Sequence, residues 1–497
     1  MTRATRSDGS NLSSEALNAL RSSVKGKVVV KGQSPEDEYR PLLERWNRMH
    51  IKEANIIVLP ETEEDVSSTI KFVGEHNLDV AISSGRHTYS GPSSSYGLII
   101  DLRNLRKVSV DENKMIAVAQ GGCIAGDVEA AAEAVGLRPV MGAVNATGCG
   151  GITTGGGIGN LSAQHGLVAD NLLAARVALA DGRIVVASDE ENQDLFWGIR
   201  GGGSNFGLVT EFTYKLHKAD PQVFSGFFMF PPDKLDAYLE LMNSMHQDYV
   251  MKSNGKFTCN GFLAIMGGNP IPGFLIWYDG PEEEGQKYIK PLLDLGPIYP
   301  GSGAEMKPHT LTTDWKQFEK MFPPQFNRLV GTSTQMNYPL SVDILKKTVE
   351  KFKDIVAAHP ESLSVSKLLF DIRDYSKIAS VPLDATAYAN RREGCLIAAD
   401  LIWDKEELDK EMLQVAKDFI SQVRAWVKED NQQKGIAEVG AHVAATTLYA
   451  LVTDGDEKLV SVFGPNLGRM KELKRKYDPD MMWDKWYPVD PNHEATN

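Results

Sequence analysis

The stretch "GCGGITTGGGIGNLSAQHG", residues 148–166, is the most distinctive segment of the sequence, because eight of its 19 residues are glycine. Glycine lets a backbone adopt positive φ and come close to a ligand. Backbone N–H groups that are exposed in this way can hold a pyrophosphate. This composition raises the question of whether the segment binds a phosphate-bearing cofactor or only forms turns.

Two common nucleotide-binding patterns do not match this segment. A Rossmann fingerprint needs a strand, the spacing GxGxxG and a helix, with an acidic residue about 20 positions further on. The glycine spacing in residues 148–166 differs from that pattern, and no "GK[ST]" of a P-loop follows. Both interpretations, glycine-rich turns and a cofactor loop of another kind, therefore stay open at this point.

A second glycine-rich run, "RGGGSNFGLVTEF" at residues 200–212, favours the cofactor interpretation. The two runs flank the segment "LLAARVALADGRIV" at residues 172–185, which is rich in apolar residues. Two such loops in one domain predict that the chain wraps a long ligand.

His87 lies in a third unusual segment, "SSGRHTYSG" at residues 83–91. A lone histidine in a turn is most often exposed or bound to a carbonyl group. As a functional group it could be a metal ligand, a proton-transfer group or a nucleophile. The metal interpretation lacks other ligands at a suitable spacing, so we expect no metal site. The other two roles stay open.

The bulk composition excludes several classes of protein. The chain has 497 residues, which is long enough for two or more domains, and a net charge of −13 without a long basic block. Nucleic acid and acidic membranes are therefore unexpected partners. The cysteines (Cys123, Cys149, Cys259 and Cys395) are too scattered for a disulfide scaffold or a zinc knuckle. The polar N-terminus resembles no secretory signal and no run of about 18 apolar residues occurs, so we expect a cytoplasmic protein.

The apolar patterns predict an α+β fold. Short β-rich runs alternate with helical runs between residues 50 and 215, and residues 62–77 place Val66, Ile70 and Val73 on one helical stripe. After residue 215, strand-like runs alternate with longer amphipathic helices at residues 341–360 and 405–430. A second domain with helices packed on one face of a sheet follows from this pattern.

Several of these segments together resemble a known family. Residues 59–91, 97–111, 116–122, 150–185 and 194–212 resemble the two halves of the FAD-binding fold of the vanillyl-alcohol-oxidase (PCMH) type, in the right order. The segment "NLGRMKELKRKYDPDMMW" is similar to the C-terminal part of the berberine-bridge-enzyme-like branch, which points to a fungal-type oxidoreductase of specialised metabolism.

The resemblance implies a division of the chain into four parts. These are an N-terminal helical segment (1–49), a two-part FAD-binding domain (50–215), a substrate domain with an antiparallel sheet covered by helices (216–454), and a C-terminal segment that returns to the FAD domain (455–497).

The resemblance also implies that FAD is the cofactor and that His87 bonds covalently to the flavin 8α-methyl group. Arg86 stands where many relatives have glycine, so its side chain should point outward or add a charge contact. A second bond through Cys149 is not expected, because the relevant position aligns with Gly148 and one residue in an extended segment reverses the side chain. The expected cofactor-binding residues are Ser83, Ser84, Gly85, Arg86, His87, Thr88, Gly148, Cys149, Gly151, Thr154, Gly155, Gly157, Asn160, Gly166, Val168, Gly207, Val209 and Asn466.

The catalytic residues are predicted from the same resemblance. Many relatives place an acidic base on a strand of the second domain, and "LLFDIRD" at residues 368–374 offers Asp371 and, less well, Asp374. The region of residues 384–403 puts Tyr388, Asn390 and Arg391 at substrate-contact positions. Sugar-oxidising relatives use a tyrosine in a "Y-x-N-Y" stretch. Here Tyr449 is kept but Val452 replaces the second tyrosine, which argues against a carbohydrate substrate.

The predicted function is hydride transfer from an alcohol, an amine or an activated C–H carbon of a small-molecule substrate to flavin N5. O2 would then reoxidise the flavin and give hydrogen peroxide. Two alternatives stay open: a redox-neutral cyclisation or rearrangement on the same scaffold, and a flavin-binding protein without catalysis. The sequence leaves the substrate and the oligomeric state undetermined.

Overall fold

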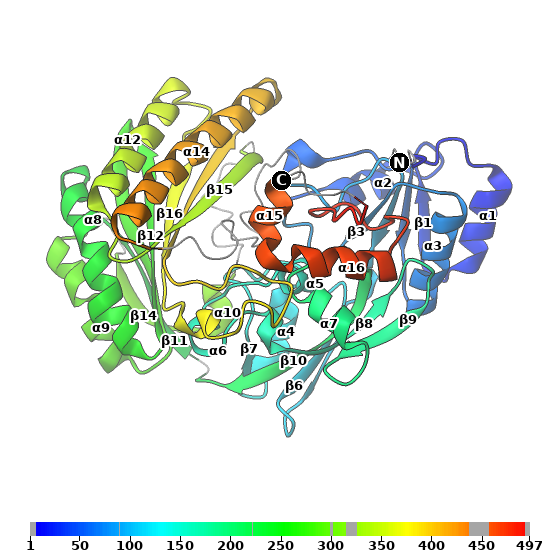
Figure 1. Ribbon diagram of the computed structural model, residues 1–497, viewed down its shortest axis with the longest axis horizontal. Coiled ribbons are helices and arrows are strands. Elements are labelled where there is room, and N and C mark those ends of the chain that lie inside the picture. Colours follow the sequence, from blue (N-terminus) through cyan, green and yellow to red (C-terminus); the bar gives the residue numbers. More distant parts are fainter. Residues whose placement is uncertain are drawn as a thin grey trace.

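The fold was analysed in a computed structural model that describes residues 6–88, 90–220, 222–298, 302–314, 326–436 and 457–492. Within these residues the strands form three sheets, of four, six and seven strands (Figure 1). Two sheets occupy one half of the molecule and the third occupies the other half. The predicted α+β class is confirmed, including an antiparallel sheet that is covered by helices.

The first sheet has the order β1 (Lys27–Val30), β2 (Ile56–Leu59), β4 (Leu98–Asp101), β3 (Val80–Ser83). Strands β2, β4 and β3 are parallel, and β1 is antiparallel to β2. Helix α3 (Glu63–Glu75) packs on this sheet. Thr62 caps it by accepting a hydrogen bond from the backbone of Asp65, and the predicted apolar stripe is fully buried.

The second sheet has the order β5 (Val108–Asp111), β6 (Ile116–Gln120), β10 (Leu208–Lys218), β8 (Leu172–Ala178), β9 (Ile184–Ser188), and β7 (Leu137–Pro139) also pairs with β10. Helices α4 (Ala125–Glu133), α5 (Cys149–Thr154) and α7 (Gln193–Ile199) contribute buried residues to the same core. The glycine-rich run of residues 148–166 therefore begins as a helix, not as the extended segment that we predicted.

The third sheet has the order β14 (Gly303–Pro308), β11 (Gln222–Met229), β13 (Asn269–Tyr278), β12 (Phe257–Met266), β16 (Lys367–Ile372), β17 (Cys395–Trp403), β15 (Arg328–Met336). Its pairings are antiparallel. Helices α8 (Leu235–Ser244), α9 (Glu282–Leu295), α12 (Val342–Ala358) and α14 (Asp409–Gln433) cover its outer face and build one large core with it (Figure 1).

The C-terminal segment lies against the half that holds the first two sheets (Figure 1). Helices α15 (Glu457–Phe463) and α16 (Leu467–Tyr477) place Phe463, Met470 and Leu473 in the core of the second sheet. The ammonium group of Lys474 is completely buried and donates hydrogen bonds to Asp478 and to the backbone oxygens of Asn205 and Trp483. These bonds fix the residues that follow α16.

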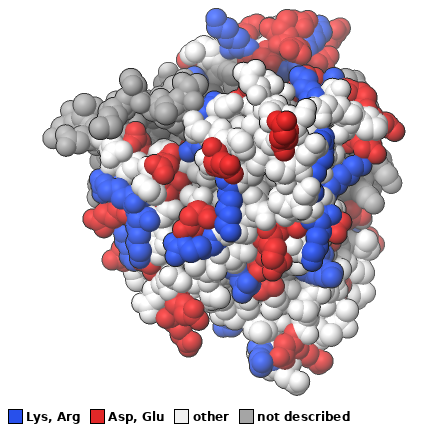
Figure 2. All heavy atoms as spheres, turned by 90° about the vertical axis from the view of Figure 1, so that its right-hand side faces the viewer, with Lys and Arg blue, Asp and Glu red and all other residues white. Residues whose placement is uncertain are grey.

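The predicted domain boundaries at residues 49 and 215 stay a prediction. Strand β10 runs across residue 215, from Leu208 to Lys218. The predicted boundary at residue 454 lies outside the described residues. On the face drawn in Figure 2, basic and acidic side chains are interspersed. No helix in the described part of the chain combines the length and the apolar character needed to cross a bilayer.

Candidate functional site

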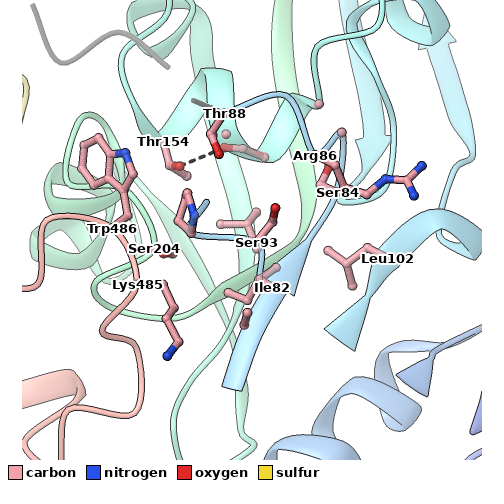
Figure 3. Close-up of a pocket in the computed structure, with 18 of the residues that line it drawn as sticks. Ile82, Ser84, Arg86, Thr88, Ser93, Leu102, Thr154, Ser204, Lys485 and Trp486 are labelled. Carbon is pink, nitrogen blue, oxygen red and sulfur yellow. Dashed lines mark hydrogen bonds between the residues drawn. The ribbon is translucent and has the colours of Figure 1, made fainter. Parts of the chain in front are cut away.

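A pocket opens where the first sheet, helix α5, the second glycine-rich run and the C-terminal segment meet (Figure 3). The turn after β3 supplies residues 84–88, and the first glycine-rich run supplies residues around the start of α5. Other parts of the wall come from β3, from residues 92 and 93, from residues 203–209 and from residues 483–486, which follow α16. Segments that are nearly 400 residues apart in the sequence therefore line one pocket.

Two glycines bring the walls of the pocket together. A Cβ atom on Gly85 would lie 2.1 Å from the backbone nitrogen of Gly148, and a Cβ on Gly148 would lie 2.2 Å from that of Gly85. Both residues line the pocket. The backbone chains touch here because neither position has a side chain, which is the close approach that such a cradle requires.

Arg86 has a φ of 56°, in the left-handed region that favours glycine. This backbone conformation gives a physical reason for the glycine that the family often has here. In Figure 3 the guanidinium group points away from Thr154 and Trp486. Desolvation is the main cause that lowers the pKa of Arg86, and the positive charge of Arg103 is the second.

His87 is buried against an aromatic ring. Its exposed fraction is 7%, and its imidazole stacks on the indole of Trp46 with 4.5 Å between ring centroids and 15° between planes. Burial lowers the pKa of His87 to about 4. The imidazole is therefore neutral at pH 7, and the neutral form carries the lone pair that a nucleophile or a proton acceptor needs.

Among the residues that the structure describes, Thr88 Oγ1, Ser93 Oγ and Trp483 Nε1 are buried polar atoms of the pocket without a hydrogen-bond partner. Each can donate a hydrogen bond, and buried donors in native proteins are seldom left unsatisfied. The hydroxyl of Ser84, in contrast, donates to the backbone oxygen of Gly121 at 2.9 Å. A ligand rich in acceptor oxygens, such as the pyrophosphate and ribose groups of FAD, fits these unpaired donors.

The structure brings together ten of the predicted cofactor-binding residues as lining residues of the pocket: Ser84, Gly85, Arg86, His87, Thr88, Gly148, Gly151, Thr154, Gly207 and Val209. Gly157 and Val168 lie outside the lining set and are joined to each other by a backbone hydrogen bond of 3.0 Å. Ser83, Gly155, Asn160 and Gly166 do not line the pocket either. The amide of Asn466 donates to the backbone oxygens of Leu383 and Thr386, which indicates a role in holding that loop.

Cys149 does not line the pocket, although its neighbours Gly148 and Gly150 do. It is the first residue of α5 and is fully buried in the core of the second sheet. Burial raises the pKa of its thiol well above the ordinary value, so the thiol stays protonated. The reason that we gave for excluding a second flavin bond, an extended backbone, was wrong, while the absence of that bond stays a prediction.

Asp371 and Tyr388 do not share this pocket. Asp371 lies on the inner face of the third sheet, 3.2 Å from the guanidinium of Arg373, and accepts a hydrogen bond of 2.8 Å from Tyr375. Its carboxylate is therefore satisfied by protein groups.

Tyr388 is buried beside Gly156 and Gly201, and burial raises its pKa, so it remains a phenol at neutral pH. The buried guanidinium of Arg391 binds Asp170. The side-chain oxygen of the neighbouring Asn390 is buried and finds no hydrogen-bond partner among the described residues. Tyr449 and Val452 lie outside the described residues.

Asp400 is a carboxylate that our sequence reasoning missed. It is 2% exposed, lies on β17 and has Lys367 at 3.5 Å. Its Oδ1 atom has no hydrogen-bond partner in the described part of the chain. Desolvation raises its pKa. Alternation along β17 places Ile397, Ala399 and Leu401 in the helix-covered core, so Asp400 lies on the inner face. A single charged residue in the apolar run "CLIAADLIW" was a signal that could have found it.

Two further groups of residues were missed for another reason. Trp46 reaches His87 from a segment before the predicted FAD domain, and Trp483, Asp484, Lys485 and Trp486 line the pocket from the other end of the chain. Only the fold brings these residues to the site. Among the residues that the structure describes, no group of three or more His, Cys, Asp or Glu side chains could hold a metal ion.

Comparison with known proteins identifies the family. Residues 54–188 match the family model of the FAD-binding domain. The chain is 43% identical over 492 residues to the FAD-linked oxidoreductase pgmH of Aspergillus terreus, with 98% of each chain covered. The chain belongs to the FAD-linked oxidoreductases. This oxidoreductase is also 30% identical over 468 residues to the FAD-linked oxidoreductase OXR1 of Pyricularia oryzae, which covers 91% of this chain and 87% of the relative.

Solved structures share the fold of this oxidoreductase. The 6-hydroxy-D-nicotine oxidase of Arthrobacter nicotinovorans superposes with a TM-score of 0.77 at 21% identity and covers 95% of this chain and 99% of its own. The berberine bridge enzyme of Eschscholzia californica superposes with a TM-score of 0.77 at 18% identity, covering 97% and 100%. The predicted family, the PCMH-type fold, the oxidoreductase class and FAD as the cofactor are thereby confirmed.

Proposed function

We propose that this FAD-linked oxidoreductase takes a hydride from an alcohol, an amine or an activated C–H group of a fungal specialised metabolite and uses O2 as its electron acceptor. Similarity to fungal FAD-linked oxidoreductases over almost the whole chain supports this proposal. Bound FAD supplies the redox chemistry, because its ring accepts a hydride at N5 and passes two electrons on to O2, giving hydrogen peroxide. The protein binds the cofactor, orients the substrate and moves the proton.

His87 is proposed as the covalent attachment point of the flavin. The observation that carries this role is a buried, neutral imidazole in the wall of a pocket whose unpaired donors fit FAD. One imidazole nitrogen would bond to the 8α carbon. The proton of the imidazole N–H and one proton of the methyl group, together with two electrons, would reduce the ring. O2 would then take the two protons and the two electrons to give hydrogen peroxide. The product is heavier than the bare chain by one FAD less two hydrogen atoms.

Asp400 is proposed as the group that accepts the substrate proton, in place of Asp371. No group in the part of the chain that the structure describes bonds its Oδ1 atom, whereas both oxygens of Asp371 are bound by Arg373 and Tyr375. A carboxylate whose pKa is raised by burial is a stronger base than an exposed one. The nearby ammonium of Lys367 would repel a cationic amine, so Asp400 favours a neutral hydroxyl group as the proton donor.

The alcohol-type reaction has a direct test. The holoenzyme is mixed without oxygen with a panel of primary, benzylic and allylic alcohols and with matching amines, and the flavin absorbance is followed. We expect at least one alcohol to bleach the flavin, and air to restore the colour with one hydrogen peroxide per molecule oxidised. Conversion of a substrate without bleaching or oxygen uptake would contradict the proposal and establish the redox-neutral alternative.

A further inference from the structure

Two contacts, one between side chains and one between backbone atoms, hold the indole of Trp46 against the imidazole of His87. The rings stack with 4.5 Å between centroids and an angle of 15°. The backbone N–H of Trp46 donates to the backbone oxygen of Arg86 at 3.1 Å. The main chain at Trp46 is therefore also bonded to the residue that precedes His87. The stack is thus fixed through both the side chains and the main chain.

The residues after Trp46 anchor this contact on the third sheet. The Asn47 side chain donates to the backbone oxygen of Leu329 at 2.8 Å and accepts from its N–H at 3.3 Å. The N–H of Arg48 donates to the backbone oxygen of Asn327 at 2.9 Å. The Trp46 ring packs against Leu329 and Ile402, which lie on β15 and β17. The indole therefore contacts both the sheet that carries Asp400 and the imidazole of His87.

Stacking restricts what the imidazole can do. A histidine side chain turns about two bonds, and a parallel ring at 4.5 Å allows the imidazole to slide in its plane but not to tilt. A nucleophile must keep its lone pair directed at the reacting carbon, and a misplacement of about 1 Å can lower a rate about a hundredfold. The orientation of His87 thus depends on a residue that does not line the pocket.

We infer that Trp46 is a positioning residue that sets the plane of the His87 imidazole for attachment of the flavin. This inference rests on the proposed covalent link at His87. It also means that the attachment point is aligned by the substrate-binding half of the molecule, through Asn47 and β15, and not by the FAD-binding half alone.

A positioning role and a space-filling role predict different results. If Trp46 only fills space, its loss weakens noncovalent FAD binding and thermal stability, and attachment slows only in proportion to the FAD that is bound. If Trp46 positions His87, the first-order rate of attachment at saturating FAD falls while the dissociation constant for noncovalent FAD stays the same. The rate at saturation therefore separates the two roles.

The experiment uses the full-length protein produced without riboflavin, to which FAD is added. Covalent incorporation is followed as flavin fluorescence that stays with acid-precipitated protein, and noncovalent affinity is measured in parallel on the His87→Ala background. Trp46→Leu keeps an apolar side chain of considerable volume but removes the ring. Trp46→Phe keeps an aromatic ring for the stack. Circular dichroism and the melting temperature show whether each variant is folded.

We expect Trp46→Leu to lower the saturating attachment rate about tenfold or more, in line with the cost of misorientation, and Trp46→Phe to stay within about threefold of the wild type. An unchanged saturating rate in a folded Trp46→Leu protein would overturn the inference and leave the His87 link intact. If the wild type itself shows no acid-stable flavin, the covalent link fails and the inference fails with it. If Trp46→Leu does not fold, the folded Trp46→Phe protein decides: a saturating attachment rate about tenfold or more below that of the wild type, despite the aromatic ring, would also overturn the inference.

Discussion

Gly85 and Gly148 touch backbone to backbone, although 62 residues of sequence separate them, and a Cβ on either would lie within 2.2 Å of the other's amide nitrogen. The contact joins the turn that carries His87 to the first glycine-rich run. The pocket exists because these two loops approach this closely, and both glycines belong to its wall.

Gly148→Ala should therefore separate the two loops. Neither neighbour is a flexible side chain, so the clash must move main chain, and we expect a loss of about 2–3 kcal/mol in the free energy of unfolding together with most of the bound flavin. Chemical denaturation and the ratio of flavin to protein absorbance measure both effects. Gly468→Ala is the matched control, since no described atom outside the backbone of α16 itself lies within 4 Å of its Cβ position, and it should gain up to about 1 kcal/mol. Full flavin content in Gly148→Ala would refute the close-contact explanation.

Asp400→Asn and Asp371→Asn make the same chemical change on the same face of one sheet. We expect Asp400→Asn to keep its flavin and to lose about a hundredfold in kcat, since it removes the proposed proton acceptor. Asp371→Asn should instead lose about 3 kcal/mol of stability, because it removes the carboxylate that neutralises the buried guanidinium of Arg373. Steady-state kinetics and denaturation midpoints distinguish the two. A large kcat loss in Asp371→Asn alone would restore Asp371 as the base.

The pH dependence of flavin attachment should follow the lowered pKa of His87. A proton on the imidazole blocks the lone pair, so the rate is full above the pKa and falls as the pH drops through it. With a pKa of about 4, we expect the attachment rate to be constant from pH 8 to pH 5.5. An imidazole with the ordinary pKa of about 6.5 would instead lose rate as the pH falls through that value. Asp484 also lines the pocket with Arg86 and Lys485, so the profile is repeated on Asp484→Asn to identify a carboxylate titration. A midpoint near 6.5 in both proteins would contradict the buried, neutral imidazole.

The indole N–H of Trp483 should bind the cofactor. Trp483→Phe keeps most of the ring volume but removes this unpaired donor, and we expect the noncovalent dissociation constant for FAD to rise about fivefold, the worth of one hydrogen bond. Titration is done in the His87→Ala background, where FAD is exchangeable. Trp403→Phe removes an indole bond to Asp409 far from the pocket and serves as the control. Equal affinities in the two variants would show that the Trp483 donor faces no ligand.

Local patterns predicted the parts of the fold that depend on neighbouring residues. The stripe of Val66, Ile70 and Val73 predicted helix α3, because all of its apolar positions lie within one segment at helical spacing. The turn at residues 84–88 and the glycines at 148, 151 and 207 were predicted as site residues through family resemblance, and they do line one pocket.

Sequence analysis missed residues whose role depends on contacts across the chain. Trp46 meets His87 only because Asn47 is fixed to β15, almost 300 residues away, and Trp483 reaches the pocket because the buried Lys474 holds its backbone. Asp371 and Asp400 have the same chemistry and differ only in their partners. The helical start at Cys149 was also missed, because glycine-rich composition predicts turns and the surrounding core decides otherwise.

The intact mass of the denatured protein tests the central claim most directly. The account predicts that the wild-type chain, loaded with FAD in air, carries one FAD less two hydrogen atoms, that fragmentation places this mass on His87, and that His87→Ala has only the mass of the bare chain. A loaded wild-type protein that releases all of its flavin on unfolding, or that carries it on Cys149, would contradict the account.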